Sequence, residues 1–246
     1  MYKLGKLPKK FDKRNLKLSN YLKEKVEFPK YLDWTKGVTQ WGMMSNDVLG
    51  CCTCSTAGHK IQGWTLNDAM SMITLSNNDI VKAYMEVSGY DGTPQTDNGA
   101  YVLDLLKYWK NVGIGGHKID AFVEVDVKNI DLIKTAIYLF GSVYTGIELP
   151  LSCQNQLIWD VPWYGTWFNG AKGSWGGHAL SLHGYGNNLI GVTWAKRQMI
   201  TERFFSFYGS EAYAVLSIAD WLGADNKAPN LFDLNKLEKD LKEVSK

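Results

Sequence analysis

The chain has 246 residues, of which 45% are hydrophobic and 21% charged, and its formal net charge at pH 7 is +2. This composition is typical of a globular protein with a substantial core and excludes a disordered or fibrous chain. No apolar run approaches the roughly 18 residues of a membrane helix, and no apolar stretch follows the basic N-terminus as a secretory signal requires. The expected location is therefore cytoplasmic or particle-associated.

Residues 1–32 form a basic extension. The first 30 residues carry ten Lys and Arg against three Asp and Glu, a net charge of +7, which leaves the rest of the chain acidic. Leucines alternate with these lysines, so we predict that the extension packs over its own acidic domain. Contact with a protein partner is the alternative, and nucleic acid is not an expected partner.

Hydrophobic periodicity divides the remainder into a helical part and a stranded part. Helices are predicted at residues 53–66, 78–87 and 101–112, followed by one more helix at 130–140. Strands are predicted at residues 118–125, 142–149, 179–185, 188–194 and 212–217. Residues 159–175, rich in Trp, Gly and Pro, predict a long loop, and the leucines of residues 223–246 predict a C-terminal amphipathic helix. The sum is an α+β fold.

Four cysteines are present, and three of them, Cys51, Cys52 and Cys54, lie within four positions. Such crowding does not indicate a disulfide framework. A zinc site lacks a convincing set of four ligands, and a redox pair lacks its usual βαβ context. The alternative to a chemical role is that the three thiols are simply buried where a helix packs against the sheet. We therefore expect no metal and no cofactor.

Cys52 has the surroundings that a nucleophilic thiol needs. It follows Gly50 at the expected start of a helix, where unpaired N–H groups favour a thiolate. His178 lies 126 residues downstream, between glycines at a strand start, and is the candidate base. Asn46, six residues before Cys52, is a candidate donor to a developing oxyanion.

Further motifs appear in a consistent order along the chain. They are Asp33-Trp34, Val38-Thr39, Asn46, Cys52, Asn98-Gly99-Ala100-Tyr101, His178-Ala179 and Gly184-Tyr185-Gly186. Over residues 33–218 this order resembles the papain-like cysteine peptidase superfamily. The resemblance implies a papain-like two-lobe domain over residues 33–222, with a helical lobe followed by an antiparallel β lobe. It also implies that Asn98, Gly99, Ala100, Gly177 and Trp194 lie at the substrate.

The sequence departs from that family pattern in three ways, the first being that Thr53 and Ser55, not the family's Trp, follow the candidate thiols. The family's cysteine spacing would make Cys54 the nucleophile, but that alignment puts Val48 in the oxyanion position, so we favour Cys52. The family's histidine-orienting Asn is replaced within Val192-Thr193-Trp194. Thr193 is the substitute candidate, although strand alternation turns it to the face opposite position 192.

Two functions follow from these observations. The first is a cysteine hydrolase that cleaves a peptide or related amide through an acyl-thioenzyme with a Cys52–His178 dyad. The alternative is an inactive papain-like scaffold that serves as a binding or structural subunit of a larger assembly such as a virion. The aromatic loop 159–175 is expected to be either a wall of the substrate site or a surface for a protein partner.

Overall fold

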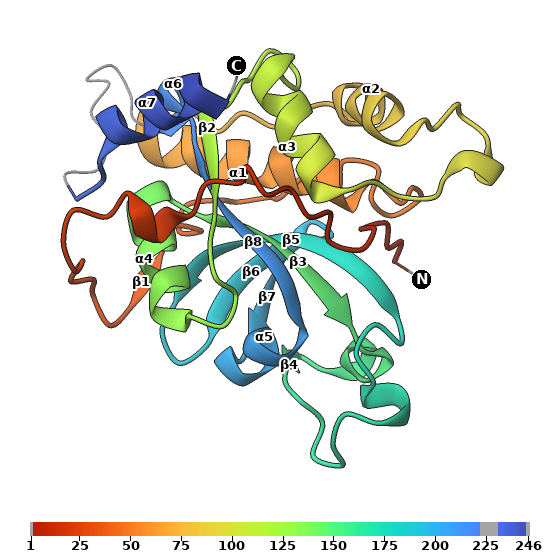
Figure 1. Ribbon diagram of the computed structural model, residues 1–246. Coiled ribbons are helices and arrows are strands. Elements are labelled where there is room, and N and C mark those ends of the chain that lie inside the picture. The colour runs from red at the N-terminus through yellow and green to blue at the C-terminus, as the bar shows by residue number, and fades with distance from the viewer. Residues whose placement is uncertain (1, 222–230, 245–246) are drawn as a thin grey trace.

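Figure 1 shows the computed structural model, in which residues 2–221 and 231–244 are described. Helices α1 (Cys52–Ala69), α2 (Asn77–Ser88) and α3 (Val102–Asn111) lie together on one side. A strongly curved sheet lies on the other side, with α4 (Ile130–Phe140) and α5 (Glu202–Tyr208) against it. The α+β prediction is confirmed.

The helical lobe is built on α1, whose residues 52–65 are all buried. Met70 ends this helix in the left-handed conformation, with a φ of 53°. The second helix starts at a capping box in which Ser76 and Asp79 each bond the other's backbone N–H. Leu105, Leu106 and Trp109 of α3 are buried in the same core as α1, and α3 contacts that helix.

The sheet joins strands in the order β2-β8-β3-β5-β6-β7-β4, and β1 also pairs with β5. Every pair is antiparallel except β4 with β7, which is parallel. The bounds are β1 Leu32–Asp33, β2 Ala121–Glu124, β3 Val143–Leu149, β4 Ile158–Trp159, β5 Gly176–Tyr185, β6 Leu189–Thr193, β7 Lys196–Ile200 and β8 Gly209–Leu216.

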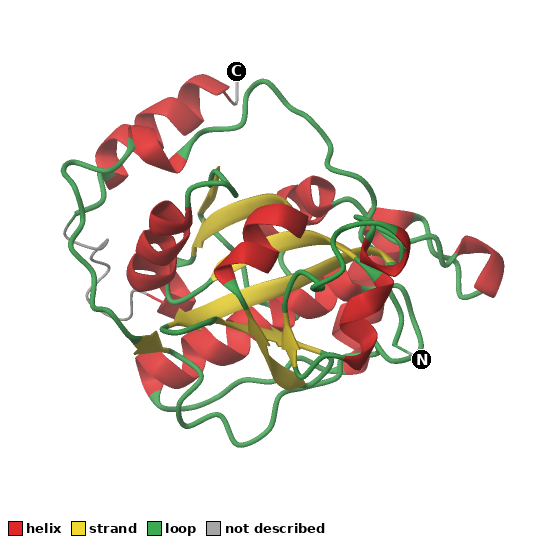
Figure 2. Cartoon of the chain, turned by 90° about the horizontal axis from the view of Figure 1, so that it is seen from below, coloured by secondary structure: helices red, strands yellow, loops and turns green. Residues whose placement is uncertain are grey.

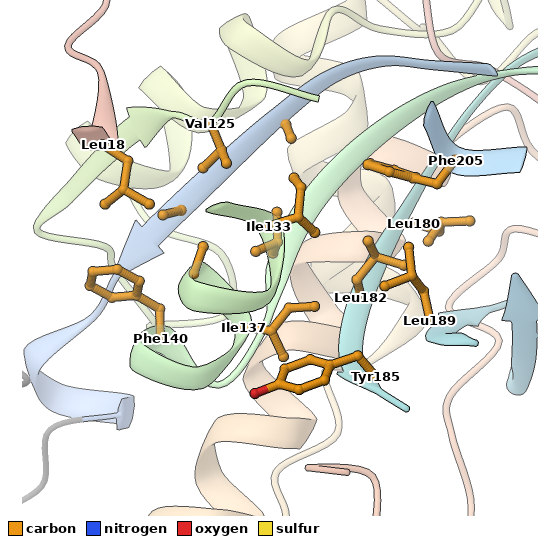
Figure 3. Close-up of a cluster of buried hydrophobic side chains, with 14 of the residues drawn as sticks. Leu18, Val125, Ile133, Ile137, Phe140, Leu180, Leu182, Tyr185, Leu189 and Phe205 are labelled. Atoms are coloured by element: carbon orange, nitrogen blue, oxygen red, sulfur yellow. The ribbon is translucent and has the colours of Figure 1, made fainter. Parts of the chain in front are cut away.

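A second hydrophobic core lies inside the β lobe, where α4 packs on the sheet. Ile133 and Ile137 of α4 face Leu180 and Leu182 of β5 in this cluster (Figure 3). Asn129 caps α4 by accepting the Leu132 N–H at 2.9 Å, and Gly141 closes it with a φ of 71°. Two separate cores therefore hold the two lobes.

The basic extension and the C-terminal elements both pack on this body. Leu18 and Tyr21 are buried in the β-lobe core, and the Tyr21 hydroxyl donates to Asp240 at 2.6 Å. Asp240 belongs to α7 (Leu234–Val244), which follows α6 (Ile218–Trp221). Figure 2 shows these and the other helices around the strands. Of the predicted C-terminal helix over residues 223–246, positions 223–230 and 245–246 lie outside the described residues.

Strand β7 and helix α5 were not predicted from the sequence, nor were the short elements β1, β4 and α6. Strand β7 begins Lys-Arg-Gln and leaves its first two residues exposed, so hydrophobic alternation gives no signal there. Helix α5 has only seven residues, too few for a helical period to be recognised. Both lie after the predicted strand at 188–194, and neither contributes a residue to the site.

Candidate active site

Cys52 is the first residue of α1 and is fully buried. Gly50 forms the turn before it, and the Gly50 N–H donates to Asp97 at 2.9 Å, which fixes that turn. Backbone N–H groups of Ala179 (at 3.4 Å) and Gly5 point at the Cys52 sulfur. The thiol therefore sits at a helix N-terminus and against the residue that follows His178, as a nucleophile would.

His178 is held from one side by Thr193. Its Nε2 lies 2.6 Å from the Thr193 hydroxyl oxygen. The sheet register explains this contact: Ser181 pairs with Val192, so Thr193 lies on the same face as Leu180 and His178. Residues 192 and 193 face opposite sides of the sheet. Thr193 lies on the side that carries His178, and Val192 lies on the other side.

The other nitrogen of His178 is free to act as a base. Among the described residues, Nδ1 of His178 is buried without a hydrogen-bond partner. When Nε2 carries the ring proton, the Thr193 oxygen accepts it and Nδ1 keeps its lone pair. The arrangement supplies an orienting group, a base and a nearby thiol, although the thiol and Nδ1 are not hydrogen-bonded to each other here.

Trp194 covers the imidazole. Its ring stacks on His178 with centroids 4.1 Å apart, and Tyr2 stacks on its other face at 4.6 Å. Trp159 and Trp175, at the two ends of the aromatic loop 159–175, also pack near Trp194. Those loop ends thus form part of the wall around the histidine.

The middle of the aromatic loop points outward instead. Trp163 is 94% exposed and Phe168 is 89% exposed. The ends of the loop pack around Trp194, and its middle presents apolar side chains to solvent. A role as a wall of the substrate site or as a surface for a protein partner stays a prediction.

Asn46 is buried beside Cys52, and its side-chain amide donates to two backbone carbonyls. One is Leu49 at 3.2 Å, in the turn before α1; the other is Lys3 at 3.4 Å. The indole N–H of Trp194 donates to the same Lys3 oxygen at 3.3 Å. A buried amide that already donates to a peptide carbonyl has the chemistry of an oxyanion donor.

The carbonyl of Lys3 belongs to a stretch that we call the interlobe segment, residues 2–7. This segment is extended and bonded to both lobes: the Lys6 N–H donates to Gly177, at 3.1 Å. On the helical side, Ala100 donates to Gly5 at 2.8 Å and accepts from Leu7 at 3.0 Å. In Figure 1 the first part of the chain runs along the line where the helices meet the sheet.

Glycines allow this close approach. A Cβ on Gly99 would lie 2.1 Å from the Gly5 oxygen, and one on Gly177 would lie 2.1 Å from the Lys6 oxygen. On the segment itself, a Cβ on Gly5 would lie 1.7 Å from the oxygen of Gly50. Any side chain at Gly5 is therefore incompatible with the segment's place, because a carbonyl of a fixed turn stands there.

Four of the five predicted substrate-binding residues, Gly99, Ala100, Gly177 and Trp194, contact the interlobe segment. Asn98 is exposed, and its amide donates to Gln95 at 3.1 Å. Two further groups at the site, Glu148 and Glu211, were not predicted, because nothing local to them in the sequence marks a functional role. Both carboxylates form ion pairs with the ammonium group of Lys6.

Burial beneath the segment sets the protonation of the site. It raises the pKa of Cys52 to about 11, and the N–H groups of Ala179 and Gly5 offset this only in part. Burial also lowers the pKa of His178 to about 3, with a smaller contribution from His59. In this closed arrangement both groups are neutral at pH 7, so the thiol is not activated.

The other three cysteines are buried, and the contacts of their thiols are with residues other than histidine. Cys54 is fully buried in the helical core, and burial raises its pKa well above the ordinary value. The Cys51 thiol donates to the oxygen of Met44 and also contacts Ser55. Cys153 donates to Pro150. None of the three faces a histidine in these contacts, so the geometry favours Cys52 over Cys54 as the nucleophile.

The remaining histidines of the helix and sheet are held by protein groups. His59 Nε2 lies 2.8 Å from the oxygen of Gly42, and His183 Nε2 lies 2.8 Å from the Ser181 hydroxyl. Within residues 2–221 and 231–244 no group of three or more His, Cys, Asp or Glu is placed to hold a metal ion. No helix in that part of the chain is long and apolar enough to cross a membrane.

Solved structures share this architecture. Xylellain, a cysteine protease from Xylella fastidiosa, matches with a TM-score of 0.69 at 15% identity, covering 88% of this chain and 97% of its own. The Carica candamarcensis cysteine protease CMS1MS2, in complex with E-64, matches with a TM-score of 0.56 at 16% identity over 77% of this chain and 99% of its own. The chain has the papain-like fold.

A third papain-like structure, the bromelain protease from Ananas comosus in complex with E64, matches with a TM-score of 0.56 at 13% identity, again over 77% and 99% of the two chains. No protein-family model and no curated protein matches the sequence. The predicted papain-like fold is thus confirmed by structure, at sequence identities of 13–16%.

Proposed function

We propose that the protein is a latent papain-like cysteine hydrolase, which cleaves a peptide or related amide bond once the interlobe segment has left the site. The observation that carries this proposal is the segment itself. An extended peptide backbone lies across Cys52, paired with Ala100 and Gly177 and with one carbonyl on the Asn46 amide. The site is therefore built to bind peptide next to a thiol and an imidazole.

The reaction would proceed in two stages. His178 Nδ1 takes the thiol proton, and the Cys52 sulfur attacks the carbonyl carbon while Asn46 and the Cys52 backbone N–H bind the oxyanion. The C–N bond then breaks as His178 returns the proton to the leaving amine, which leaves an acyl-thioenzyme. Water, deprotonated by His178, attacks this thioester, and the acid and free thiol are released.

The interlobe segment occupies the site without being cleaved in this proposal, and its contacts with Cys52 and Asn46 bear on why. The Gly5 N–H points at the Cys52 sulfur, so the segment presents a hydrogen-bond donor to the thiol. The one segment carbonyl on Asn46, that of Lys3, is shared with the indole of Trp194. A bound substrate would instead have to place its scissile carbonyl carbon within attack distance of the thiolate. The segment thus occupies the site as an unreactive peptide.

Gly5→Val in the full chain tests the proposal. The valine side chain cannot coexist with the Gly50 carbonyl, which is fixed through Asp97, so the segment is expelled while the rest of the chain stays intact. We expect the variant to hydrolyse fluorogenic peptide amides that the unmodified chain cleaves slowly or not at all. Rates are measured by fluorescence against a diverse peptide library.

Lys13→Val is the matched control, since Lys13 lies exposed in the same extension. This variant should behave as the unmodified chain does. Absence of hydrolysis by Gly5→Val on every peptide would reject the hydrolase and favour the scaffold, for which the neutral thiol of the closed site is the supporting observation.

Thr193→Val should weaken catalysis in the Gly5→Val background. The substitution keeps the shape of the side chain but removes the oxygen that lies 2.6 Å from His178 Nε2. Loss of one such bond costs about 1–3 kcal/mol, which corresponds to a kcat roughly 10- to 100-fold lower. The measurement is the pH dependence of kcat and of KM separately.

Thr193→Ser restores the hydroxyl and should recover most of kcat. A purely structural role for Thr193 would instead lower thermal stability and leave kcat of the folded fraction unchanged. An equal kcat in the valine and serine variants would show that Thr193 does not position His178.

A further inference from the structure

The side chain of Lys6 is completely buried although it carries an ammonium group. Its Nζ lies 3.1 Å from a Glu148 oxygen and 3.2 Å from a Glu211 oxygen, and it donates to the carbonyl of Leu7 at 2.8 Å. A buried cation is tolerated only when it is paired in this way. Lys6 therefore fills a site that is specific for a positive charge.

That site is a pocket in the β lobe, which we call the acidic pocket and define as Gly146, Glu148, Glu211 and Tyr213. Gly146 provides the room: a Cβ there would lie 2.6 Å from Cδ of Lys6 and 2.8 Å from Cγ of Glu211. The Tyr213 hydroxyl donates to Glu211 at 3.3 Å. Glu211 is 1% exposed and Glu148 is 26% exposed, so the pocket has a buried end and an open end.

The pocket lies directly beside the reacting groups. On β3, Gly146 pairs with Ala179, whose N–H contacts the Cys52 sulfur, and Glu148 pairs with Gly177, which binds the backbone of Lys6. A peptide residue that binds Gly177 through its N–H consequently projects its side chain toward Glu211. Whatever peptide replaces the interlobe segment must meet the same pocket.

Removing the segment leaves the pocket without its cation. Within the described residues, the ion pairs of Glu148 and Glu211 are both with Lys6. Burial raises the pKa of Glu211, and Lys6 and more weakly Lys9 act against this; Lys9 pairs with Glu124 and belongs to the same extension. A buried carboxylate that loses its partner is strongly destabilised, so the open pocket favours a new cation over an apolar side chain.

We propose that the acidic pocket selects peptide substrates by a lysine or arginine side chain, and that Lys6 occupies it in the closed chain. The inference rests on the proposed hydrolase function, because it names the substrate class of that same site. Glu211 at the buried end and Glu148 at the mouth are its specificity-determining residues, and Gly146 keeps the space between them open.

Hydrolysis gives the first test, with the full-length Gly5→Val chain and a position-scanning library of fluorogenic peptide amides. One position should prefer lysine or arginine over norleucine by at least about tenfold in kcat/KM. Adding Glu211→Gln, or Glu148→Gln at the partly exposed mouth, should remove that preference. Glu202→Gln on α5 is the control and should keep it.

Binding gives a second test that needs no turnover. The full chain with both Gly5→Val and Cys52→Ala is titrated calorimetrically with a peptide of residues 2–10, or with the same peptide carrying norleucine in place of Lys6. The lysine peptide should bind at least about tenfold more tightly, and Glu211→Gln should abolish the difference.

The two tests separate the two proposals. Hydrolysis without a basic preference, together with equal affinity for both peptides, would overturn the acidic pocket and leave the hydrolase standing. A lysine preference in binding, without hydrolysis of any peptide, would support the pocket and reject the hydrolase. Equal affinity in the titration overturns the pocket whatever the hydrolysis shows.

Discussion

Cys52→Ala, introduced into the Gly5→Val chain, is expected to reduce peptide-amide hydrolysis by at least about 10⁴-fold, to the background of the assay. The sulfur is the atom that forms the acyl-enzyme, and no other described thiol contacts the residue next to His178. The variant should keep its far-UV circular dichroism and nearly its melting temperature, since only one atom is removed from the side chain. Initial rates and thermal unfolding are measured on the same preparation.

Cys54→Ala supplies the matched control. Cys54 lies on the same helix and is equally buried, but its sulfur contacts the Thr53 hydroxyl at 3.9 Å, whereas the Ala179 N–H donates to Cys52. It should retain most of the activity at a modest cost in stability. The reverse pattern, with Cys54→Ala inactive and Cys52→Ala active, would transfer the nucleophile to Cys54 and reject the geometry described above.

Gly5→Val should also change how Cys52 responds to pH. In the closed chain burial holds the thiol pKa at about 11, so its alkylation rate should keep rising with pH up to that value. Once the segment is expelled, water and the N-terminus of α1 stabilise the thiolate and lower the pKa to about 8.5 or below. A lower pKa means more thiolate at neutral pH, so alkylation at pH 7.5 should be at least about 100-fold faster.

The measurement is the second-order rate of iodoacetamide alkylation of Cys52 between pH 5 and pH 10, resolved by peptide mass spectrometry. Lys13→Val should follow the unmodified chain throughout. Superimposable profiles for Gly5→Val and the unmodified chain would show that the interlobe segment does not control the thiol.

The places of several candidate site residues in the fold could be predicted from the sequence, because their signals are local or keep a fixed order. Cys52 after a turn glycine, Asn46 six residues earlier and His178 far downstream each occupy the expected places relative to α1 and β5. Gly99 and Gly177 also lie where the resemblance to papain-like peptidases implies, beside a bound peptide backbone. Spacing along the chain suffices when the fold is one that the order of motifs already indicates.

Thr193 shows where local reasoning is insufficient. Alternation correctly separates residues 192 and 193, but it does not say which of the two faces carries His178. That depends on the register between β5 and β6, which is set by pairing across the sheet. The alignment with the family's asparagine pointed to position 192, whereas the fold presents position 193 to the imidazole.

The acidic pocket lay beyond any sequence argument. Lys6 is separated from Glu211 by 205 positions, and it was one of many lysines in a basic extension. Its importance comes from the interlobe segment being placed between the lobes, and from the missing side chain of Gly146, which leaves room for it. Neither the placement nor the space has a local signature in the chain.

The central claim is that Cys52 forms an acyl-thioenzyme when the interlobe segment is displaced. The most direct test mixes Gly5→Val with a lysine-containing peptide p-nitrophenyl ester, quenches it with acid within one turnover, and maps the adduct by mass spectrometry. We expect one acyl group per chain, attached to the Cys52 sulfur and absent in Cys52→Ala. Acylation spread over all four cysteines, or none beyond that of denatured protein, would contradict the account.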